Sequence, residues 1–246
     1  QQKGLLSFGG PYSNHIHALA YAGHVLGIPT VGIVRGYPHY LQNPTLTDAA
    51  RWGMQLKLVD KRTYAQRHDS AYLKQCLQDF PQHLVVPEGG SDSFGVAGAA
   101  RIWQLPALSE VLPDYLVVPV GSGGTFAGLI SAAPKQVKVL GISVLNAELD
   151  LSDRVTELVN TQSHSVNAKW QLDRAGHCGG YGKTTPELMK FIADFAAKYH
   201  ISLDPVYTGK MMLRLHNLVK DGYFPKGANI AALHTGGLQG VRGFQS

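Results

Sequence analysis

Short runs of apolar residues alternate along this chain with longer stretches in which apolar residues recur every three or four positions. The continuous runs predict β-strands at residues 4–8, 30–34, 55–59, 83–87, 115–120, 137–145 and 229–234. The spaced stretches predict helices at residues 13–26, 44–52, 70–80, 94–104, 152–161, 186–199 and 209–220. Apolar strands that alternate with helices are typical of parallel sheets covered on both faces. We therefore predict an α/β protein with two doubly wound parallel sheets, divided near residues 90–105.

Composition and charge fit this architecture and narrow the functional classes. The 246 residues are 44% hydrophobic and 16% charged, as in an ordinary globular chain with a buried core. No apolar run reaches the length of about 18 residues that indicates a membrane helix. The net charge of +5 is spread without a basic block, so we expect neither a membrane nor a nucleic acid as partner. Two cysteines, Cys76 and Cys178, supply neither a disulfide framework nor a metal cluster, and with no signal-peptide pattern we expect the cytoplasm.

The glycine-rich stretch GSGGTFAG (121–128) is the strongest local signal for ligand binding. It follows a predicted buried strand and opens a helix, so its backbone N–H groups can converge on an anion at the helix N-terminus. A dinucleotide fingerprint would need glycine where Phe126 stands, and an acidic residue near Leu145-Asn146. A phosphate-bearing ligand other than a dinucleotide is therefore the better interpretation.

A second glycine-rich stretch, HCGGYGKTTPE (177–187), resembles a nucleotide-binding P-loop only superficially. His177 replaces the first required glycine, and the preceding residues KWQLDRAG are too polar for a buried strand. The remaining glycine pairs, at 9–10, 89–90 and 236–237, follow predicted strands, where parallel sheets bind ligands. Hydroxyl and amide side chains accompany these strand ends and suggest one shared pocket: Ser13, Asn14, Ser122, Thr125 and Thr235.

Seven stretches of the chain occur in the order seen in one family of pyridoxal-phosphate enzymes. They are SFGGPYSNHIHALA, NPTLTDAARWGMQL, VVPEGGSDSFG, VPVGSGGTFAG, GGYGKTTPE, LDPVYTGK and LHTGG. The chain thus resembles the tryptophan-synthase-β-like fold (fold type II), most of all the group of 1-aminocyclopropane-1-carboxylate (ACC) deaminase and D-cysteine desulfhydrase. This resemblance implies a smaller domain at 5–95, a larger domain at 96–246 and a cofactor site in the cleft between them.

The resemblance also implies which residues hold the cofactor, pyridoxal 5'-phosphate. Asn14 would hydrogen-bond the pyridine 3-hydroxyl, and Thr235 would meet the pyridine nitrogen. Thr208 is expected among the cofactor-binding residues as well. The cofactor phosphate would be wrapped by Gly121, Ser122, Gly123, Gly124 and Thr125.

On the substrate side, the resemblance assigns residues to binding and to catalysis. Ser13 and His15 would meet the carboxylate of a small amino acid at a helix N-terminus, where an anion is favoured. Tyr181 and Tyr207 would flank the substrate and, together with Ser13, take part in the chemistry. A homodimer is expected from the same likeness.

Two positions separate the two activities of this group. ACC deaminases resemble DPVYEGK, with glutamate where this chain has Thr208, and carry an apolar residue where it has Thr235. The sequence therefore favours D-cysteine desulfhydrase, which eliminates a β-substituent and yields pyruvate, ammonium and sulfide. The alternative is ACC deaminase, in which a tyrosine phenolate such as that of Tyr207 helps to open the ring to 2-oxobutanoate and ammonium.

The lysine that the family attaches to its cofactor has no counterpart here. It belongs to a GNK-type motif upstream of the strand that ends in SFGG, whereas only six residues precede Ser7 and Lys3 is too close to that strand. Lys183 and Lys210 are expected at the surface or in the first turn of a helix. Because the sequence begins with Gln1, we expect the lysine segment upstream of it. The alternative is a non-catalytic protein that binds pyridoxal phosphate.

Overall fold

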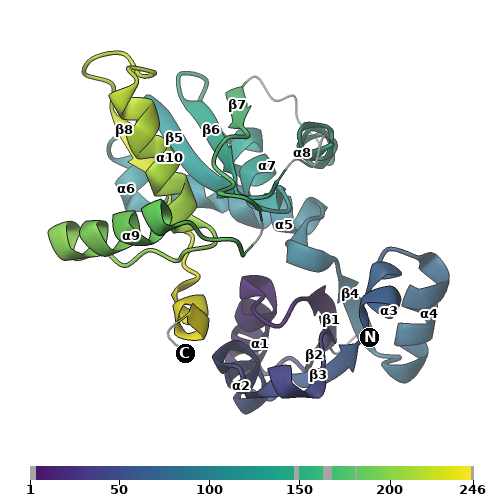
Figure 1. Ribbon diagram of the computed structural model, residues 1–246. Coiled ribbons are helices and arrows are strands. Elements are labelled where there is room, and N and C mark those ends of the chain that lie inside the picture. The colour runs from purple at the N-terminus through teal and green to yellow at the C-terminus, as the bar shows by residue number, and fades with distance from the viewer. Residues whose placement is uncertain (1–3, 147–149, 163–167, 181, 245–246) are drawn as a thin grey trace. The chain divides into compact units, whose positions relative to one another are not determined.

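Figure 1 shows the computed structural model of the chain, which describes residues 4–146, 150–162, 168–180 and 182–244. These residues form two compact units, one comprising the chain up to Gly90 together with 239–244, and the other running from Ser91 to Leu238. Each unit contains a parallel four-stranded sheet, as predicted. The described helices include none with the length and apolar character needed to span a bilayer.

The first unit is built on a sheet with the strand order β3-β2-β1-β4, all parallel. Its strands are β1 (Gly4–Gly9), β2 (Thr30–Arg35), β3 (Gln55–Val59) and β4 (His83–Val86). Its α-helices are α1 (Asn14–Leu26), α2 (Pro44–Arg51), α3 (Lys61–Ala65) and α4 (Ser70–Asp79). Short 3-10 segments are η1 (Pro38–Gln42), η2 (Glu88–Gly90) and η4 (Leu238–Phe244).

Both faces of this sheet are covered, which explains why its two central strands are mostly apolar. Phe8 and Ile33 point to the face packed by α3 and α4. Val34 points to the opposite face, where Ile16 of α1 and Leu46 of α2 cover it. The alternation follows from the two-residue period of a strand, and all five side chains are at most 1% exposed.

The second unit repeats the plan with the strand order β7-β6-β5-β8, again parallel. Its strands are β5 (Tyr115–Val120), β6 (Lys138–Ser143), β7 (Lys169–Asp173) and β8 (Ile230–Ala232). Its helices are α5 (Ser93–Ala100), α6 (Pro106–Ser109), α7 (Gly124–Ser131), α8 (Leu151–Asn160), α9 (Pro186–Tyr199) and α10 (Thr208–Lys220), with the 3-10 segment η3 (Arg101–Gln104).

Neighbouring residues of β5 again serve opposite faces. Val117 packs with Met211 and Leu215 of α10, which runs along one side of the sheet (Figure 1). Val118 packs with Phe126 of α7 on the other side. Helices therefore cover both faces of the central strand, as the sequence predicted.

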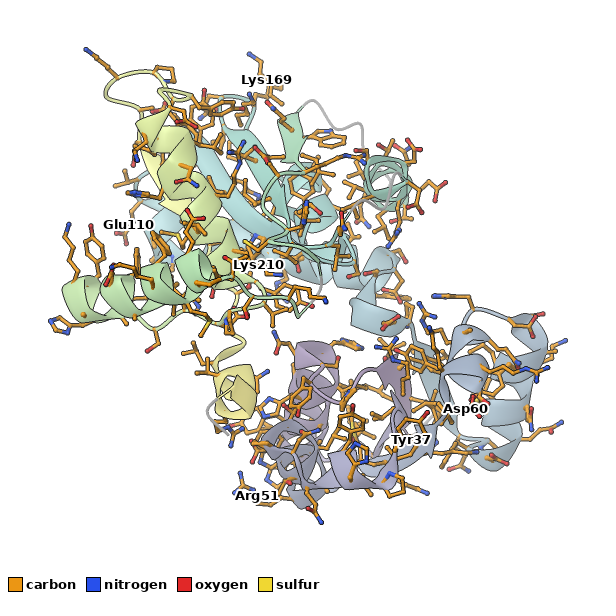
Figure 2. The ribbon with its side chains drawn as sticks, viewed as in Figure 1. Tyr37, Arg51, Asp60, Glu110, Lys169 and Lys210 are labelled. Carbon is orange, nitrogen blue, oxygen red and sulfur yellow. The ribbon has the colours of Figure 1, made fainter. Side chains whose placement is uncertain are left out.

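Strand β7 is absent from the predicted strands, because its residues were judged too polar for a buried strand. Only β6 pairs with it, so it forms an edge of the sheet. Trp170 and Leu172 pack toward the core cluster, while Lys169 and Gln171 are exposed; Lys169 is labelled in Figure 2. Its alternating pattern is that of an edge strand, whereas the prediction looked for a buried one.

The C-terminal residues 239–244 belong to the first unit, whereas the sequence-based division at residue 95 placed them in the second domain. Gln239 bonds to Asn14, and Arg242 bonds to Asp48. The chain thus returns to its first sheet after completing the second one.

Close packing of α5 against α7 generates a first prediction. A Cβ atom at Gly128 would lie 2.5 Å from both the Cβ of Ala99 and the carbonyl oxygen of Val96, whereas one at Gly98 would meet nothing within 4 Å. Gly128→Ala is therefore expected to lower the free energy of unfolding by about 1–3 kcal/mol. The matched control Gly98→Ala, on the exposed side of α5, should raise it by about 0.5–1 kcal/mol. Urea unfolding measures both, and equal effects would contradict the packing argument.

Candidate active site

The loop from Gly121 to Thr125 connects the end of β5 to the start of α7. Gly123, the N-cap of α7, has φ +101°, in the left-handed region that glycine occupies without strain. Its carbonyl accepts the first helical bond, from Ala127 N at 2.8 Å. The first N–H groups of a helix have no intrahelical acceptor, so the loop presents donors and a favourable potential to an anion.

Tight packing behind this loop fixes its course. A Cβ at Gly121 would lie 3.0 Å from Cε1 of Tyr207, and one at Gly123 would lie 3.0 Å from Cγ2 of Val155. Ser122 Oγ accepts a hydrogen bond of 2.7 Å from Ser91 Oγ. The glycines therefore let the loop backbone lie against its neighbours, and the Tyr207 ring borders the loop directly.

Thr235 lies at the same edge of the sheet as this loop. Val117 of β5 pairs with Ala232 of β8. Gly121 comes four residues after Val117, and Thr235 comes three residues after Ala232, so both follow this pair at the same end of the strands. His234, which precedes Thr235, is fixed by two hydrogen bonds. Its Nδ1 accepts a bond from Gly236 N at 3.1 Å. The proton of the neutral ring is therefore on Nε2, which donates to Ser202 O at 2.9 Å. The exposed Thr235 thus follows the strand adjacent to β5, at the same sheet edge as the glycine loop.

A buried carboxylate organises the start of α10. Asp204, 2% exposed, accepts bonds from Val206 N at 2.9 Å and from Tyr207 N at 2.8 Å. It also accepts bonds from Thr208 N at 2.8 Å and from Thr208 Oγ1 at 2.7 Å. Thr208 Oγ1 in turn accepts from Asp204 N at 2.9 Å. The Thr208 hydroxyl therefore serves the local fold that presents Tyr207, and its contact with the cofactor stays a prediction.

Lys210 is a residue whose burial sequence reasoning missed. Of the two positions expected for it, Lys210 takes the one in the first turn of a helix, α10 (Figure 2), but its side chain there is 0% exposed. Its Nζ donates to Gly180 O at 2.7 Å. Desolvation by the surrounding protein lowers the pKa of its ammonium. The sequence offered one signal for this burial: Lys210 lies three residues before the buried Leu213 and so on the same face of the helix. Lys183 is exposed, as predicted.

In the first unit, the end of β1 meets the start of α1. Ser13 is the N-cap of α1, and its Oγ accepts from Ile16 N at 3.2 Å. A Cβ at Gly9 would lie 2.7 Å from that Oγ, so glycine is needed for Ser13 to approach β1. The Ser13 hydroxyl remains a donor at a helix N-terminus, which suits a carboxylate.

The two residues after Ser13 are each held by a named partner. His15 Nε2 lies 2.7 Å from Ser7 Oγ, and the Ser7 hydroxyl donates to Val86 O at 2.8 Å, so Nε2 is the donor of the first bond. The side-chain oxygen of Asn14 accepts from Nε2 of Gln239, a contact that the sequence did not predict.

The structure brings the predicted residues together in two groups, each within one unit. Ser13, Asn14 and His15 lie at the start of α1. Tyr207 borders the loop of the second unit, and Thr235 follows the strand next to it. Tyr181 lies outside the described residues, so its predicted role stays a prediction.

Comparison with known proteins identifies the family. Residues 2–236 match the family model described as "Pyridoxal-phosphate dependent enzyme", so the chain belongs to this family. It is 30% identical to the mitochondrial bifunctional D-cysteine desulfhydrase/1-aminocyclopropane-1-carboxylate deaminase of Arabidopsis thaliana, over 96% of this chain and 64% of that protein. It is 28% identical to a D-cysteine desulfhydrase of Klebsiella pneumoniae, over 95% and 76%.

A solved structure shows the same likeness in three dimensions. The crystal structure of an ACC deaminase homologue superimposes with a TM-score of 0.84 at 26% identity, covering 99% of this chain and 76% of that one. The predicted fold, tryptophan-synthase-β-like with two parallel sheets, is therefore confirmed.

Pyridoxal 5'-phosphate is the cofactor of this family, and the residues present fit it. The Gly121–Thr125 loop offers backbone donors at a helix N-terminus, as a phosphate requires. The loop takes this course because Gly123 has a positive φ and because Gly121 lies too close to Tyr207 for a larger side chain. The hydroxyl of Thr235 at the same sheet edge suits a ring nitrogen.

Burial of Lys210 generates a prediction about pH. A lysine whose pKa falls on folding binds fewer protons in the folded state, so stability should rise with pH between the lowered pKa and the ordinary value of 10.5. Lys210→Met removes the titrating group at nearly constant length, so this rise should disappear. Urea unfolding at several pH values up to 10.5 measures the effect.

Lys183→Met, which removes an exposed lysine, is the control and should keep the pH dependence of the wild type. The same pH dependence in the wild type and in the Lys210→Met protein would contradict the assigned burial of the ammonium.

Proposed function

We propose that the chain catalyses a pyridoxal-phosphate-dependent β-elimination on a small amino acid, with D-cysteine as substrate and pyruvate, ammonium and sulfide as products. The arrangement at the carboxyl edge of the second sheet carries this proposal. There, the Tyr207 ring borders the phosphate-type loop that follows β5, and Thr235 follows the adjacent strand β8 at the same edge. The names of the similar Arabidopsis and Klebsiella proteins support the choice of substrate.

The loop and the strand end hold and orient the cofactor in this proposal. When bound, pyridoxal phosphate supplies an electron sink for the negative charge that develops at the substrate α-carbon. Backbone donors of Gly121–Thr125 bind its phosphate, and Asn14 donates to its 3-hydroxyl oxygen. Thr235 gives the ring nitrogen a neutral partner, which makes the ring a weaker sink than a carboxylate partner would. Such a ring suits a reaction in which a leaving group departs from the adjacent β-carbon.

Three residues act on the substrate. The Ser13 hydroxyl donates a hydrogen bond to the substrate carboxylate, and the positive end of the α1 dipole favours the negative charge there. His15, whose Nε2 donates to Ser7, lines the carboxylate side of the site at the same helix start. Tyr207 holds a proton at its hydroxyl oxygen for the departing β-substituent, and the Asp204 bond to its backbone N–H fixes its place.

ACC deamination is the second candidate, and a specific observation favours it. The crystal structure with a TM-score of 0.84 is that of an ACC deaminase homologue. In that reaction the Tyr207 hydroxyl would assist ring opening, with Ser13 again on the carboxylate. Thr208 and Thr235 favour D-cysteine over this alternative, since ACC deaminases resemble sequences with glutamate and an apolar residue there.

We also propose that the enzyme works in the cytoplasm as a homodimer. The cysteines Cys76 and Cys178 are free thiols, which is consistent with a reducing compartment. The dimer rests on the resemblance to the family.

Product analysis of the full-length protein loaded with pyridoxal phosphate tests the proposed function. D-cysteine should release sulfide and pyruvate, with kcat/KM above that for ACC by about tenfold or more. L-cysteine serves as the stereochemical control and should react more slowly. Faster formation of 2-oxobutanoate from ACC would select the alternative. Cofactor binding without any product would indicate a non-catalytic protein.

Tyr207→Phe tests the proton-holding role of the tyrosine. The ring that packs on Gly121 is kept, so cofactor affinity should change little. Loss of the hydroxyl should lower kcat for D-cysteine by about a hundredfold, within the range of acid–base contributions. Tyr199→Phe, on an exposed tyrosine of α9, is the matched control and should leave kcat unchanged. Full turnover by Tyr207→Phe would remove Tyr207 from the mechanism.

A further inference from the structure

The last part of the chain contacts a residue of the proposed cofactor site. We name residues 239–244 the C-terminal strap; they form most of η4 and belong to the first unit. Nε2 of Gln239 in the strap donates to Oδ1 of Asn14, the first residue of α1 after its N-cap. Both side chains belong to half-buried residues. The bond joins residues 225 positions apart, so it is a tertiary contact and not a local turn.

The direction of this bond sets the orientation of the Asn14 amide. An asparagine side chain has one acceptor oxygen and one NH₂ donor group. Gln239 supplies a donor, so the oxygen of Asn14 is directed at the strap and its Nδ2 group is directed away from it. With Gln239 presenting its Nε2 donor, rotation of the Asn14 amide by 180° would place two NH₂ groups against each other. For this orientation of Gln239, the contact therefore selects one of the two orientations of the Asn14 amide.

The strap has an anchor of its own, which does not depend on Asn14. Arg242 forms an ion pair with Asp48 of α2, whose side chain is 11% exposed. Asp48 also bonds to His17 Nε2 at 3.2 Å and to Arg51 at 3.0 Å. The hydrogen bond from Arg242 is the main cause of a lowered pKa of the Asp48 carboxyl, which therefore stays ionised. Gln239 is thus presented to α1 from a fixed segment.

We propose that Gln239 is a positioning residue that orients Asn14, so that the Nδ2 group of Asn14 donates to the 3-hydroxyl oxygen of pyridoxal phosphate. The inference rests on the proposed function, which places Asn14 at that oxygen. It extends the site to a residue that touches neither cofactor nor substrate. An acceptor oxygen turned toward the hydroxylate would repel it, so the selected orientation is the one that binds.

Two substitutions of Gln239 should affect the orientation of the Asn14 amide differently. Gln239→Ala removes the contact and leaves Asn14 free to take either orientation. Gln239→Glu replaces the donor by an acceptor, so Asn14 has to turn its NH₂ group toward the strap and away from the cofactor. Gln75→Ala, on the exposed face of α4, is the matched control for loss of a glutamine side chain.

The experiment titrates the full-length protein and these variants with pyridoxal phosphate and records the cofactor absorbance bands, which respond to the charge on the 3-hydroxyl. Gln239→Ala should weaken cofactor affinity by about three- to tenfold, the value of one hydrogen bond. Gln239→Glu should weaken it further and shift intensity from the long-wavelength to the short-wavelength band. Gln75→Ala should match the wild type in both readouts.

A second measurement separates orientation from a general loss of stability. In the Asn14→Ala background, Gln239→Ala and Gln239→Glu should have no further effect on cofactor affinity, because the group that they orient is gone. Equal losses in both backgrounds, or equal effects of the two Gln239 substitutions with an unshifted spectrum, would overturn the proposal.

Failure of the proposed function gives a different result. If the wild type shows no cofactor band and releases no product from D-cysteine, the proposed function and the role of Gln239 are both wrong. If the wild type binds the cofactor and turns over while the Gln239 variants behave like it, only the role of Gln239 is overturned.

Discussion

Parallel pairing of strands is the constraint on which the rest of this structure depends. In each unit it brings the carboxyl ends of the strands to one edge of the sheet, where the following loops meet. The pairing of Val117 with Ala232 therefore fixes where Gly121 and Thr235 can lie, although more than 100 residues separate them in the chain. Helices on both faces keep the central strand β5 buried, so the loop at its end rests on a rigid base.

The proposed site consists of neutral groups, and charged groups stabilise the segments that present them. The proposed contacts are backbone N–H groups, hydroxyls, an amide and an imidazole. The buried charges lie behind them: Asp204 accepts bonds from the first N–H groups around α10, and Lys210 binds a carbonyl of the 177–180 segment. A buried charge is costly unless it is hydrogen-bonded, so each of these groups fixes its partners firmly. These hydrogen bonds offset the free-energy cost of burying the charges, and those of Asp204 also fix the position of Tyr207.

Much of the fold and of the site was predictable because it rests on local signals. A glycine that must adopt a positive φ, such as Gly123, and a serine that must cap α1, such as Ser13, are visible in the sequence. Features that depend on tertiary context were not. Strand β7 was not predicted because its residues have the exposed, alternating pattern of an edge strand. The burial of Lys210 was not predicted because burial of a lysine has no reliable local signal. The contact of Gln239 with Asn14 joins the two ends of the chain, and no local pattern indicates it.

A site made of neutral polar groups needs other residues to decide which way each group points. An amide and an imidazole can each present a donor or an acceptor, so composition alone does not fix their function. Here Gln239 selects the donor face of Asn14, and Ser7 makes Nε2 of His15 a donor. Gly236 does the same for His234 beside Thr235. The chemistry of the site is therefore encoded partly in residues that touch no ligand, and a substitution at Ser7 or Gln239 changes a neighbour's hydrogen-bonding character while leaving the list of ligand contacts intact.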